Sequence, residues 1–274
     1  MEELGYVEGK NVAYVSRAAD GRIERLPELA VELVRLRVDI ILTTGSEATR
    51  AAKQATTTVP IVFLGPSYPV EEGLVASFAR PGGNITGITL AQSDHVSKQL
   101  QLLRDVVPTL AGVAVLWNPA NPGSNFTLRD LERAAGPMQL TIRAVPVRNP
   151  DETEAAVAAI ARVRPGALIV LPSPVLFASM QRIGELAIRL RIPSITALKQ
   201  NVELGFLLTY GADIRDLERR VAGYVEGILK GASPADLPVE RPTKFELAVN
   251  LKTAKAIGVA IPQAVLLRAD EVIQ

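Results

Sequence analysis

Short apolar runs alternate with longer stretches of helical periodicity along the whole chain. Runs such as 60–64 are apolar almost throughout, which is typical of strands buried on both faces, and helices between such strands indicate parallel sheets. Strands are predicted over residues 12–16, 39–43, 60–64, 84–89, 112–117, 140–147, 167–171, 194–197, 205–209 and 245–250. Helices are predicted over residues 25–36, 47–54, 70–78, 96–106, 126–135, 152–163, 177–190, 213–229 and 251–257. One modest sheet does not need so many strands, so two consecutive doubly wound α/β units are predicted.

The composition excludes several classes of protein. The 274 residues, 48% of them hydrophobic, can bury the core of one large domain or two modest ones. Thirty basic residues balance twenty-nine acidic ones without a basic stripe, which argues against nucleic-acid binding. No apolar run is long enough to span a bilayer. The N-terminus has neither a basic nor an apolar signal region, so no export signal is expected in the chain as given.

Catalytic and metal-binding constellations are not expected. The chain has no cysteine and one histidine, His95, interpreted as an exposed, solvated residue at the start of a helix. These residues cannot supply a thiolate zinc site, a histidine-rich metal centre or a Cys/His dyad. The G-x-S-x-G and phosphate-loop motifs are also absent. No enzyme activity, cofactor or metal is therefore predicted, although a site built from carboxylates alone stays open.

Polar residues that follow a parallel strand are the natural ligand contacts, because ligands bind beyond the carboxyl ends of such strands. In the first half, Thr44, Gly45 and Ser46 follow one predicted strand, and Ser67 and Tyr68 follow the next. The alternatives are that Ser46 only caps a helix and that Ser67 and Tyr68 belong to a rigid proline-rich turn.

Further strand-end candidates occur in the second half. Asn118, Asn121 and Ser124 lie in a stiff loop with two Asn-Pro pairs, for which the alternative is a helix start capped by Ser124. Ser173 is a weaker candidate of the same kind. Tyr210 and Asp213 follow the strand predicted at 205–209, and Asp213 is either a helix cap or a partner for an ammonium group.

Several ordered segments resemble the ABC transporter substrate-binding protein family related to tryptophan and tyrosine uptake. They are Glu3-Leu4-Gly5-Tyr6-Val7-Glu8-Gly9-Lys10-Asn11, Pro60-Ile61-Val62-Phe63, Ala79-Arg80-Pro81-Gly82-Gly83-Asn84-Ile85-Thr86-Gly87, Trp117-Asn118-Pro119-Ala120-Asn121-Pro122, Asp236-Leu237-Pro238-Val239-Glu240 and Asn250-Leu251-Lys252-Thr253-Ala254-Lys255. The resemblance covers essentially the whole chain and is more specific than any single motif.

The resemblance implies a type I periplasmic-binding-protein fold, with two Rossmann-like lobes joined by three crossovers near residues 91, 204 and 231. The N-terminal lobe is then 1–91 with 204–230, and the C-terminal lobe 92–203 with 231–274. Family members normally carry a secretory signal, a first strand and most of a helix before the Glu3–Tyr6 motif, so the first strand of lobe 1 is expected to be missing. The strand at 60–63 is usually followed by an Asp-Pro pair, whereas here Ser67, Tyr68 and Pro69 bring no carboxylate.

The implied function is the solute-binding component of an ABC importer. It would bind a small molecule, an aromatic or other amino acid among the options, in a cleft between the lobes by hinge closure. A ligand carboxylate would meet the N–H groups at Thr44–Ser46, and its body would pack by Tyr68 or by Trp117, although Trp117 fits the core better. The expected partners are the membrane permease subunits, the location is the periplasm, and the state is monomeric.

Three alternatives remain at this stage. Ligand-sensing regulatory domains share the fold, but no DNA-binding segment accompanies this one. An enzyme of the same two-lobed shape would need paired carboxylates. A truncated, non-functional paralogue would fit the missing first strand.

Overall fold

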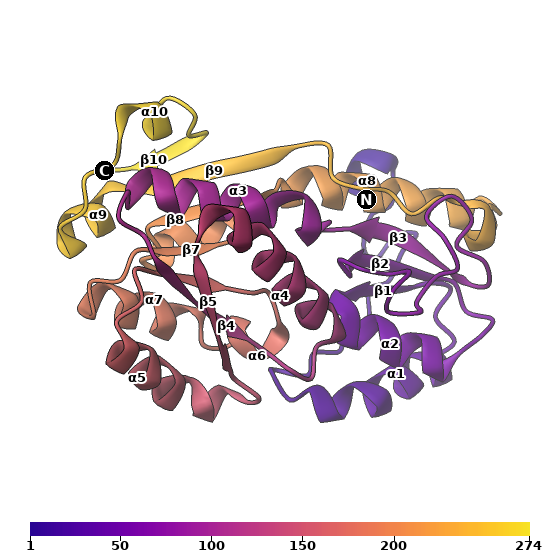
Figure 1. Ribbon diagram of the computed structural model, residues 1–274. Helices are drawn as coiled ribbons and strands as arrows, with labels where there is room; N and C mark the ends of the chain where they lie inside the picture. Colours follow the sequence, from indigo (N-terminus) through magenta and orange to yellow (C-terminus); the bar gives the residue numbers. More distant parts are fainter. The chain divides into compact units, whose positions relative to one another are not determined.

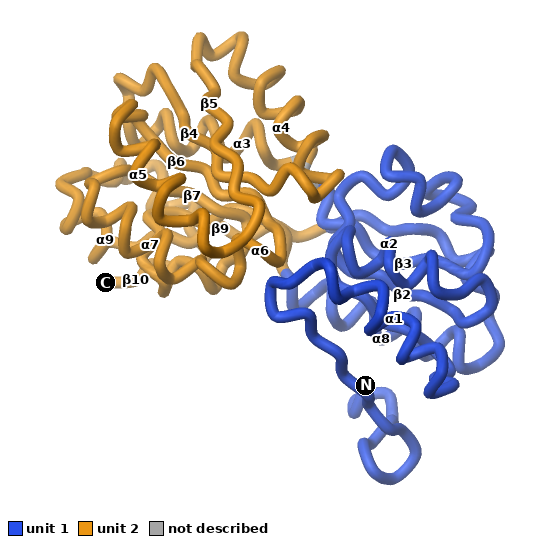
Figure 2. The backbone as a smooth tube through the Cα atoms, turned by 90° about the horizontal axis from the view of Figure 1, so that it is seen from below, with its two compact units in different colours: residues 1–91, 214–242 blue, residues 92–213, 243–274 orange. Residues whose placement is uncertain are grey.

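The computed structural model describes the backbone of residues 1–274 and all side chains except those of Gln92 and Asp94. The chain forms two compact units (Figure 2): unit 1 is 1–91 with 214–242, and unit 2 is 92–213 with 243–274. The chain therefore crosses between the units after residues 91, 213 and 242. The second and third crossovers lie later than the positions near 204 and 231 taken from the sequence.

Unit 1 contains a three-stranded parallel sheet in the order β1-β2-β3. Two helices cover one face of this sheet and the long helix α8 lies on the other (Figure 1). Its elements are β1 (Ile41–Thr44), β2 (Ile61–Gly65), β3 (Ile85–Thr89), α1 (Leu26–Arg35), α2 (Gly45–Ala55) and α8 (Ile214–Leu229), with 3-10 turns at Glu2–Leu4, Ile23–Arg25 and Pro234–Asp236. Its core contains Ile41, Ile61, Phe63 and Ile85.

Residues 231–242 belong to unit 1 because they line the free edge of β3. The backbone N–H of Thr89 donates to the carbonyl of Glu240 at 3.0 Å, and that of Glu240 to Gly87 at 3.1 Å. The Thr86 hydroxyl adds a bond to the carbonyl of Leu237 at 2.7 Å. These bonds explain why the third crossover comes after residue 242.

Unit 2 contains a seven-stranded sheet in the order β10-β9-β8-β7-β6-β4-β5. Figure 1 shows α3 and α4 on one face of this sheet and α5 and α7 on the other. The strands are β4 (Gly112–Trp117), β5 (Thr141–Pro146), β6 (Ala167–Val170), β7 (Ser194–Thr196), β8 (Leu208–Ala212), β9 (Phe245–Asn250) and β10 (Glu271–Ile273). The helices are α3 (Gln92–Val106), α4 (Pro122–Ala135), α5 (Thr153–Val163), α6 (Pro174–Phe177), α7 (Met180–Arg189), α9 (Leu251–Ile257) and α10 (Gln263–Leu266), with 3-10 turns at Gly136–Met138, Pro150–Glu152 and Lys199–Leu204 (η5).

The last two strands of unit 2 depart from the predicted parallel arrangement. β9 pairs antiparallel with β8, and β10 pairs parallel with β9. The chain leaves unit 2 just after β8 and returns at the same point, where the N–H of Asp213 donates to the carbonyl of Lys244 at 3.0 Å. A strand that re-enters there must run back along β8, which makes the pair antiparallel.

Two predicted elements are absent, each for a local reason. Residues 12–16 form no strand: Val12 makes one isolated bridge to Glu8, and Tyr14 is 52% exposed. An alternating apolar pattern yields a strand only where a neighbour can pair with its backbone. Residues 70–78 form successive turns instead of a helix, because Gly73 has a φ of +69°, in the left-handed region that ends a right-handed helix.

Two further predictions were only partly right. The helix predicted over 177–190 is divided into α6 and α7 by Ala178 and Ser179. The strand predicted at 205–209 begins three residues later, because Gly205, with a φ of +94°, forms the left-handed end of the 3-10 turn η5. None of the helices that the structure describes combines the length and the apolar composition needed to cross a bilayer.

Candidate ligand-binding site

In unit 1, helix α2 begins directly where β1 ends. Thr44 occupies the N-cap position but makes no side-chain cap, and Gly45 has a φ of +79°, which glycine adopts without strain. The end of β2 comes close to this point: a Cβ on Gly65 would lie 2.9 Å from the Gly45 nitrogen. The two glycines therefore let the carboxyl ends of β1 and β2 approach the first turn of α2.

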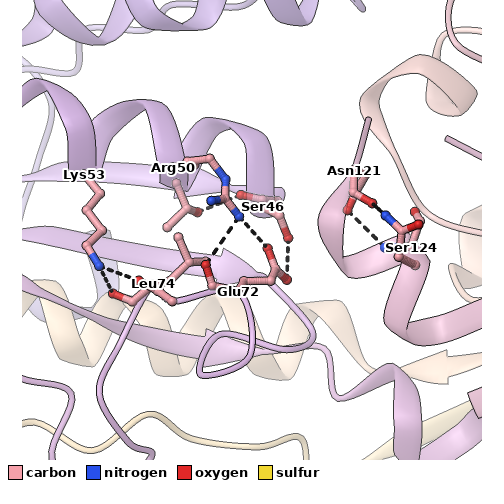
Figure 3. Close-up of polar contacts among 11 residues, drawn as sticks. Ser46, Arg50, Lys53, Glu72, Leu74, Asn121 and Ser124 are labelled. Carbon is pink, nitrogen blue, oxygen red and sulfur yellow. Dashed lines mark hydrogen bonds and ion pairs between the residues drawn. The ribbon is translucent and has the colours of Figure 1, made fainter. Parts of the chain in front are cut away.

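Ser46 lies in the first turn of α2 and does not cap it. Its side chain is buried, and its hydroxyl donates to Oε1 of Glu72 at 3.0 Å (Figure 3). Glu72 comes from the turns that follow β2, and its side chain is fully buried. The carboxylate expected to be missing from this edge of the sheet is thus supplied by Glu72, a residue that the sequence analysis did not single out.

The second carboxylate oxygen of Glu72 is incompletely satisfied. Oε2 is buried and accepts no hydrogen bond from the described residues, and the Arg50 guanidinium lies 3.8 Å from it. Burial raises the pKa of the Glu72 carboxyl to about 7, and the charge of Glu47 adds to this, while the Ser46 hydrogen bond and Arg50 lower it. A buried carboxyl with a pKa near neutrality and an open acceptor is typical of functional sites.

Ser67 and Tyr68 are held within the turn that leads to Glu72. The Ser67 hydroxyl donates to the Gly65 carbonyl at 3.4 Å, and the Tyr68 carbonyl accepts from the Glu72 N–H at 2.8 Å. Tyr68 is only 7% exposed, so most of its ring is buried. The turn therefore positions Glu72, whatever Ser67 and Tyr68 contribute to a ligand.

In unit 2, the loop after β4 is ordered by its two asparagines. Asn118 Oδ1 accepts from the Ala120 N–H at 3.0 Å, and Asn121 Oδ1 accepts from the Ser124 N–H at 3.2 Å. Asn121 is therefore the N-cap of α4, with Pro122 in the first turn, and the alternative in which Ser124 caps this helix was wrong. The helix starts four residues earlier than expected because Asn121 supplies this cap.

Two buried amides of unit 2 have open donors. Asn118, after β4, and Asn201, in η5 after β7, are 0% and 3% exposed, and the Nδ2 atom of each donates no hydrogen bond within the part of the chain that the structure describes. An unsatisfied buried amide costs about 1–3 kcal/mol, so such groups require an explanation. Asn201 was missed by the sequence analysis, because nothing local to η5 distinguishes it.

Three other predicted residues of unit 2 have structural roles. Ser173, which follows β6, the strand between β4 and β7, caps the short helix α6 by accepting from the Leu176 N–H at 3.2 Å. Asp213 lies at the second crossover, directly before α8. Trp117 packs against the hydrophobic core of unit 2, as favoured from the sequence, although its Nε1 is buried without a hydrogen-bond acceptor among the described residues.

Tyr210 does not lie in a strand-end turn, because β8 continues to Ala212. Its ring stacks on Phe245 at a centroid distance of 6.1 Å, and His95 meets it edge-on at 6.3 Å. His95 is 1% exposed, so the interpretation of this residue as solvated was wrong. The strand pairing between β8 and β9, which the sequence did not predict, brings the rings of Tyr210 and Phe245 together.

The polar groups at the two sheet edges suit binding by hydrogen bonds and charge. Among the residues whose side chains the structure describes, no three His, Cys, Asp or Glu side chains gather closely enough to hold a metal ion. Unit 1 offers a buried carboxylate oxygen and unit 2 offers buried amide donors. A small polar molecule can donate a hydrogen bond to the first and accept hydrogen bonds from the second.

Comparisons with known proteins agree with this fold. A family model for ABC transporter substrate binding proteins matches residues 1–273. A tyrosine-binding protein from Clostridioides difficile strain R20291 is 26% identical over 262 residues, which make up 94% of this chain and 74% of that protein.

Two solved structures are similar over nearly the whole chain. A conserved domain protein from Vibrio cholerae O1 biovar El Tor has a TM-score of 0.94 at 25% identity, covering 99% of this chain and 90% of that one. An ABC domain from Streptococcus pneumoniae in complex with L-Trp has a TM-score of 0.90 at 23% identity, covering 99% and 92%. The fold is thus the α/β type I periplasmic-binding-protein fold predicted from the sequence. The match over essentially its full length shows that the chain belongs to the ABC transporter substrate-binding protein family.

Proposed function

We propose that this protein binds a free amino acid and hands it, chemically unchanged, to the membrane permease of an ABC importer. The family match supports a small-molecule ligand and a transporter partner. The relative at 26% identity is a tyrosine-binding protein, which supports an amino acid, with aromatic ones foremost. The periplasm is the proposed location.

The observation that carries the amino-acid proposal is the pair of open amide donors in unit 2. The Nδ2 atoms of Asn118, which directly follows β4, and of Asn201, in η5, are buried and lack acceptors among the described residues. A carboxylate is an acceptor with about four lone-pair sites, and hydrogen bonds to a charged group are stronger than neutral ones. The ligand's carboxylate is therefore assigned to unit 2.

This assignment differs from the expectation based on the sequence alone. The first turn of α2, with Thr44, Gly45 and Ser46, was expected to hold the ligand's carboxylate. In unit 1, however, the carboxylate of Glu72 already accepts from the Ser46 side chain. A second carboxylate there would face like charge, which favours the amides of unit 2.

The remaining contacts stay proposals of the sequence analysis. Ser67, Tyr68, Ser124, Ser173, Tyr210 and Asp213 are proposed ligand neighbours, and the caps and packing described above already account for several of them. Hinge closure on the ligand is also proposed, and small-angle X-ray scattering with and without ligand tests it through the radius of gyration.

A thermal-shift screen of the twenty amino acids, purines and small carboxylates tests the function. One or more amino acids should raise the melting temperature in proportion to the logarithm of their concentration, because a ligand that binds only the folded state stabilises it. A folded protein that no amino acid stabilises would contradict the proposal.

A leucine variant, nearly the same shape as asparagine, separates effects on binding from effects on folding. Asn118→Leu removes an unsatisfied donor, so the unliganded protein should be no less stable, while the ligand-induced shift should be lost. Asn149→Ala is the matched control, because the Asn149 amide of unit 2 already contacts Glu152. This control should keep the full ligand-induced shift.

A further inference from the structure

The Glu72 carboxylate has contacts that are needed neither to form the fold nor to cap helix α2. One oxygen, Oε1, accepts from the Ser46 hydroxyl at 3.0 Å, whereas Oε2 is buried and accepts no hydrogen bond from the part of the chain that the structure describes. The carboxylate adjoins the first turn of α2, an eleven-residue helix whose N-cap residue makes no side-chain cap. Figure 3 shows the contacts that Ser46 and Arg50, both on α2, make with Glu72.

The charges that act on Glu72 leave room for a cation. Arg50 lies 3.8 Å from Oε2, but its side chain is 39% exposed and it also donates to the backbone carbonyl of Glu72 at 3.4 Å. Glu47, in the first turn of α2, adds a second negative charge that acts on Glu72. Lys53 donates to the carbonyls of Gly73 and Leu74 instead of to Glu72. The cation paired with Glu72 is thus a partly solvated guanidinium, and the charge of Glu47 opposes its effect on the Glu72 carboxyl.

We propose that the carboxylate of Glu72, beside the first turn of α2, forms an ammonium subsite, in which Glu72 Oε2 accepts a hydrogen bond from the charged amino group of the ligand. This proposal rests on the proposed amino-acid ligand and extends it to a specific group. An ammonium has three donors and no acceptor, so it matches an open carboxylate oxygen. A buried carboxylate that gains a charged donor also recovers part of the free energy lost when it was removed from water.

The subsite predicts selectivity by charge. A ligand that lacks the amino group cannot donate a hydrogen bond to Glu72 Oε2 and leaves this oxygen unsatisfied. A ligand with an additional carboxylate at this position would be repelled by Glu72 and Glu47. Selection between an amino acid and its des-amino analogue should therefore be much sharper than selection between side chains of similar size.

Binding should also depend on pH, because the ammonium binds the ionised carboxylate. Burial raises the pKa of Glu72 to about 7, with Arg50, Glu47 and the Tyr68 backbone as the other groups that act on it. Below that pH the carboxyl is protonated in the free protein and must release a proton on binding. Affinity should fall by roughly thirtyfold between pH 8 and pH 5.5 through this group alone.

Isothermal titration calorimetry on the full chain tests the proposal. The probes are L-tyrosine and L-tryptophan, with 3-(4-hydroxyphenyl)propionate and tyramine as tyrosine analogues that lack the amino and the carboxyl group respectively. The variants are Glu72→Gln, which keeps the shape of the side chain, and Glu71→Gln, which removes the same charge from the exposed neighbouring residue. Circular dichroism confirms that both variants are folded before titration.

The expected result has three parts. Wild type binds at least one amino acid at least a hundredfold more tightly than its des-amino analogue. Glu72→Gln lowers the affinity for that amino acid at least tenfold, whereas Glu71→Gln does not. The loss of affinity at low pH disappears in Glu72→Gln. Equal binding of tyrosine and its des-amino analogue, or unchanged affinity and pH dependence in Glu72→Gln, would overturn the ammonium subsite and leave the proposed function intact. If a folded wild type bound neither an amino acid nor tyramine, the proposed function and the subsite would both fall.

Discussion

Ser46 and Glu72 join two separate strand ends of unit 1, because the Ser46 hydroxyl at the start of α2 donates to Glu72 Oε1 at 3.0 Å from the turns after β2. The two residues are twenty-six positions apart in sequence. Their contact fixes a carboxyl group at the sheet edge where this fold binds ligands. Several predictions about stability depend on the state of that carboxyl.

Glu72→Gln should stabilise the unliganded protein at high pH. The pKa of Glu72 rises from an ordinary 4.5 to about 7 in the folded chain, so the folded state holds the proton more tightly than the unfolded state. The Glu72 carboxyl therefore contributes its full stabilisation below pH 4.5. This contribution declines as the pH rises through 7 and is constant above that, so the free energy of unfolding falls by about 3 kcal/mol in total. Glutamine carries no charge, so the variant should gain up to that amount at pH 8 and nothing at pH 4.5.

Urea denaturation at both pH values measures this difference. Glu71→Gln serves as the control and should show no such pH-dependent gain. A Glu72→Gln variant that is less stable than wild type at pH 8 would contradict this prediction. It would mean that contacts in the folded protein outweigh the cost of burying the ionised Glu72 carboxylate.

Ser46→Ala should destabilise the protein more at pH 8 than at pH 5. At pH 8 the Ser46 hydroxyl donates to an ionised carboxylate, and such a hydrogen bond is worth about 1.5–3 kcal/mol. At pH 5 the Glu72 carboxyl is largely neutral, so the lost hydrogen bond is weaker. The pKa of Glu72 should rise further, since the Ser46 hydrogen bond lowers it. Carbon-13 NMR of the Glu72 carboxyl during a pH titration checks the direction, and a lower pKa in the variant would be inconsistent with the contact.

Asn121→Ala should cost about 1 kcal/mol by removing the N-cap of α4. Asn121→Ser should recover most of that loss, since serine is also a good cap. Glu132→Ala, an exposed position of the same helix, serves as the neutral comparison. Chemical denaturation distinguishes the three, and equal stability of Asn121→Ala and wild type would show that the cap contributes nothing.

Two helical glycines should respond to alanine in opposite ways. A Cβ on Gly184 in α7 would lie 2.0 Å from the Leu204 carbonyl oxygen, so Gly184→Ala should destabilise by 1–3 kcal/mol or more. A Cβ on Gly223 in α8 would meet nothing within 4 Å, so Gly223→Ala should stabilise by about 0.5–1 kcal/mol. Melting temperatures that move in the same direction for both variants would contradict this packing.

Much of the fold could be predicted because the signals are local. The strand over 112–117 is apolar throughout and appears as β4 with the predicted bounds, and the helix over 25–36 appears as α1 to within one residue at each end. Residues 12–16 have an equally good strand pattern but no partner for their backbone. Pairing is decided by the rest of the chain, so this failure could not be read from the segment itself.

The candidate site was less predictable, for a related reason. Thr44, Ser46, Asn118 and Ser173 were found because they directly follow strands. Glu72 and Asn201 were missed because turns and a 3-10 segment separate them from the strand ends, and only the folded turn places Glu72 against Ser46. Tyr210 was misplaced because the strand pairing that extends β8 comes from β9, thirty-five residues later.

Electron density of a crystal grown with the amino acid chosen by the melting screen tests the central claim most directly. The account predicts one amino acid at the carboxyl ends of the parallel strands, with its ammonium within hydrogen-bonding distance of Glu72 Oε2. A ligand bound away from these strand ends, or crystals of folded protein in which the amino acid never binds, would contradict it.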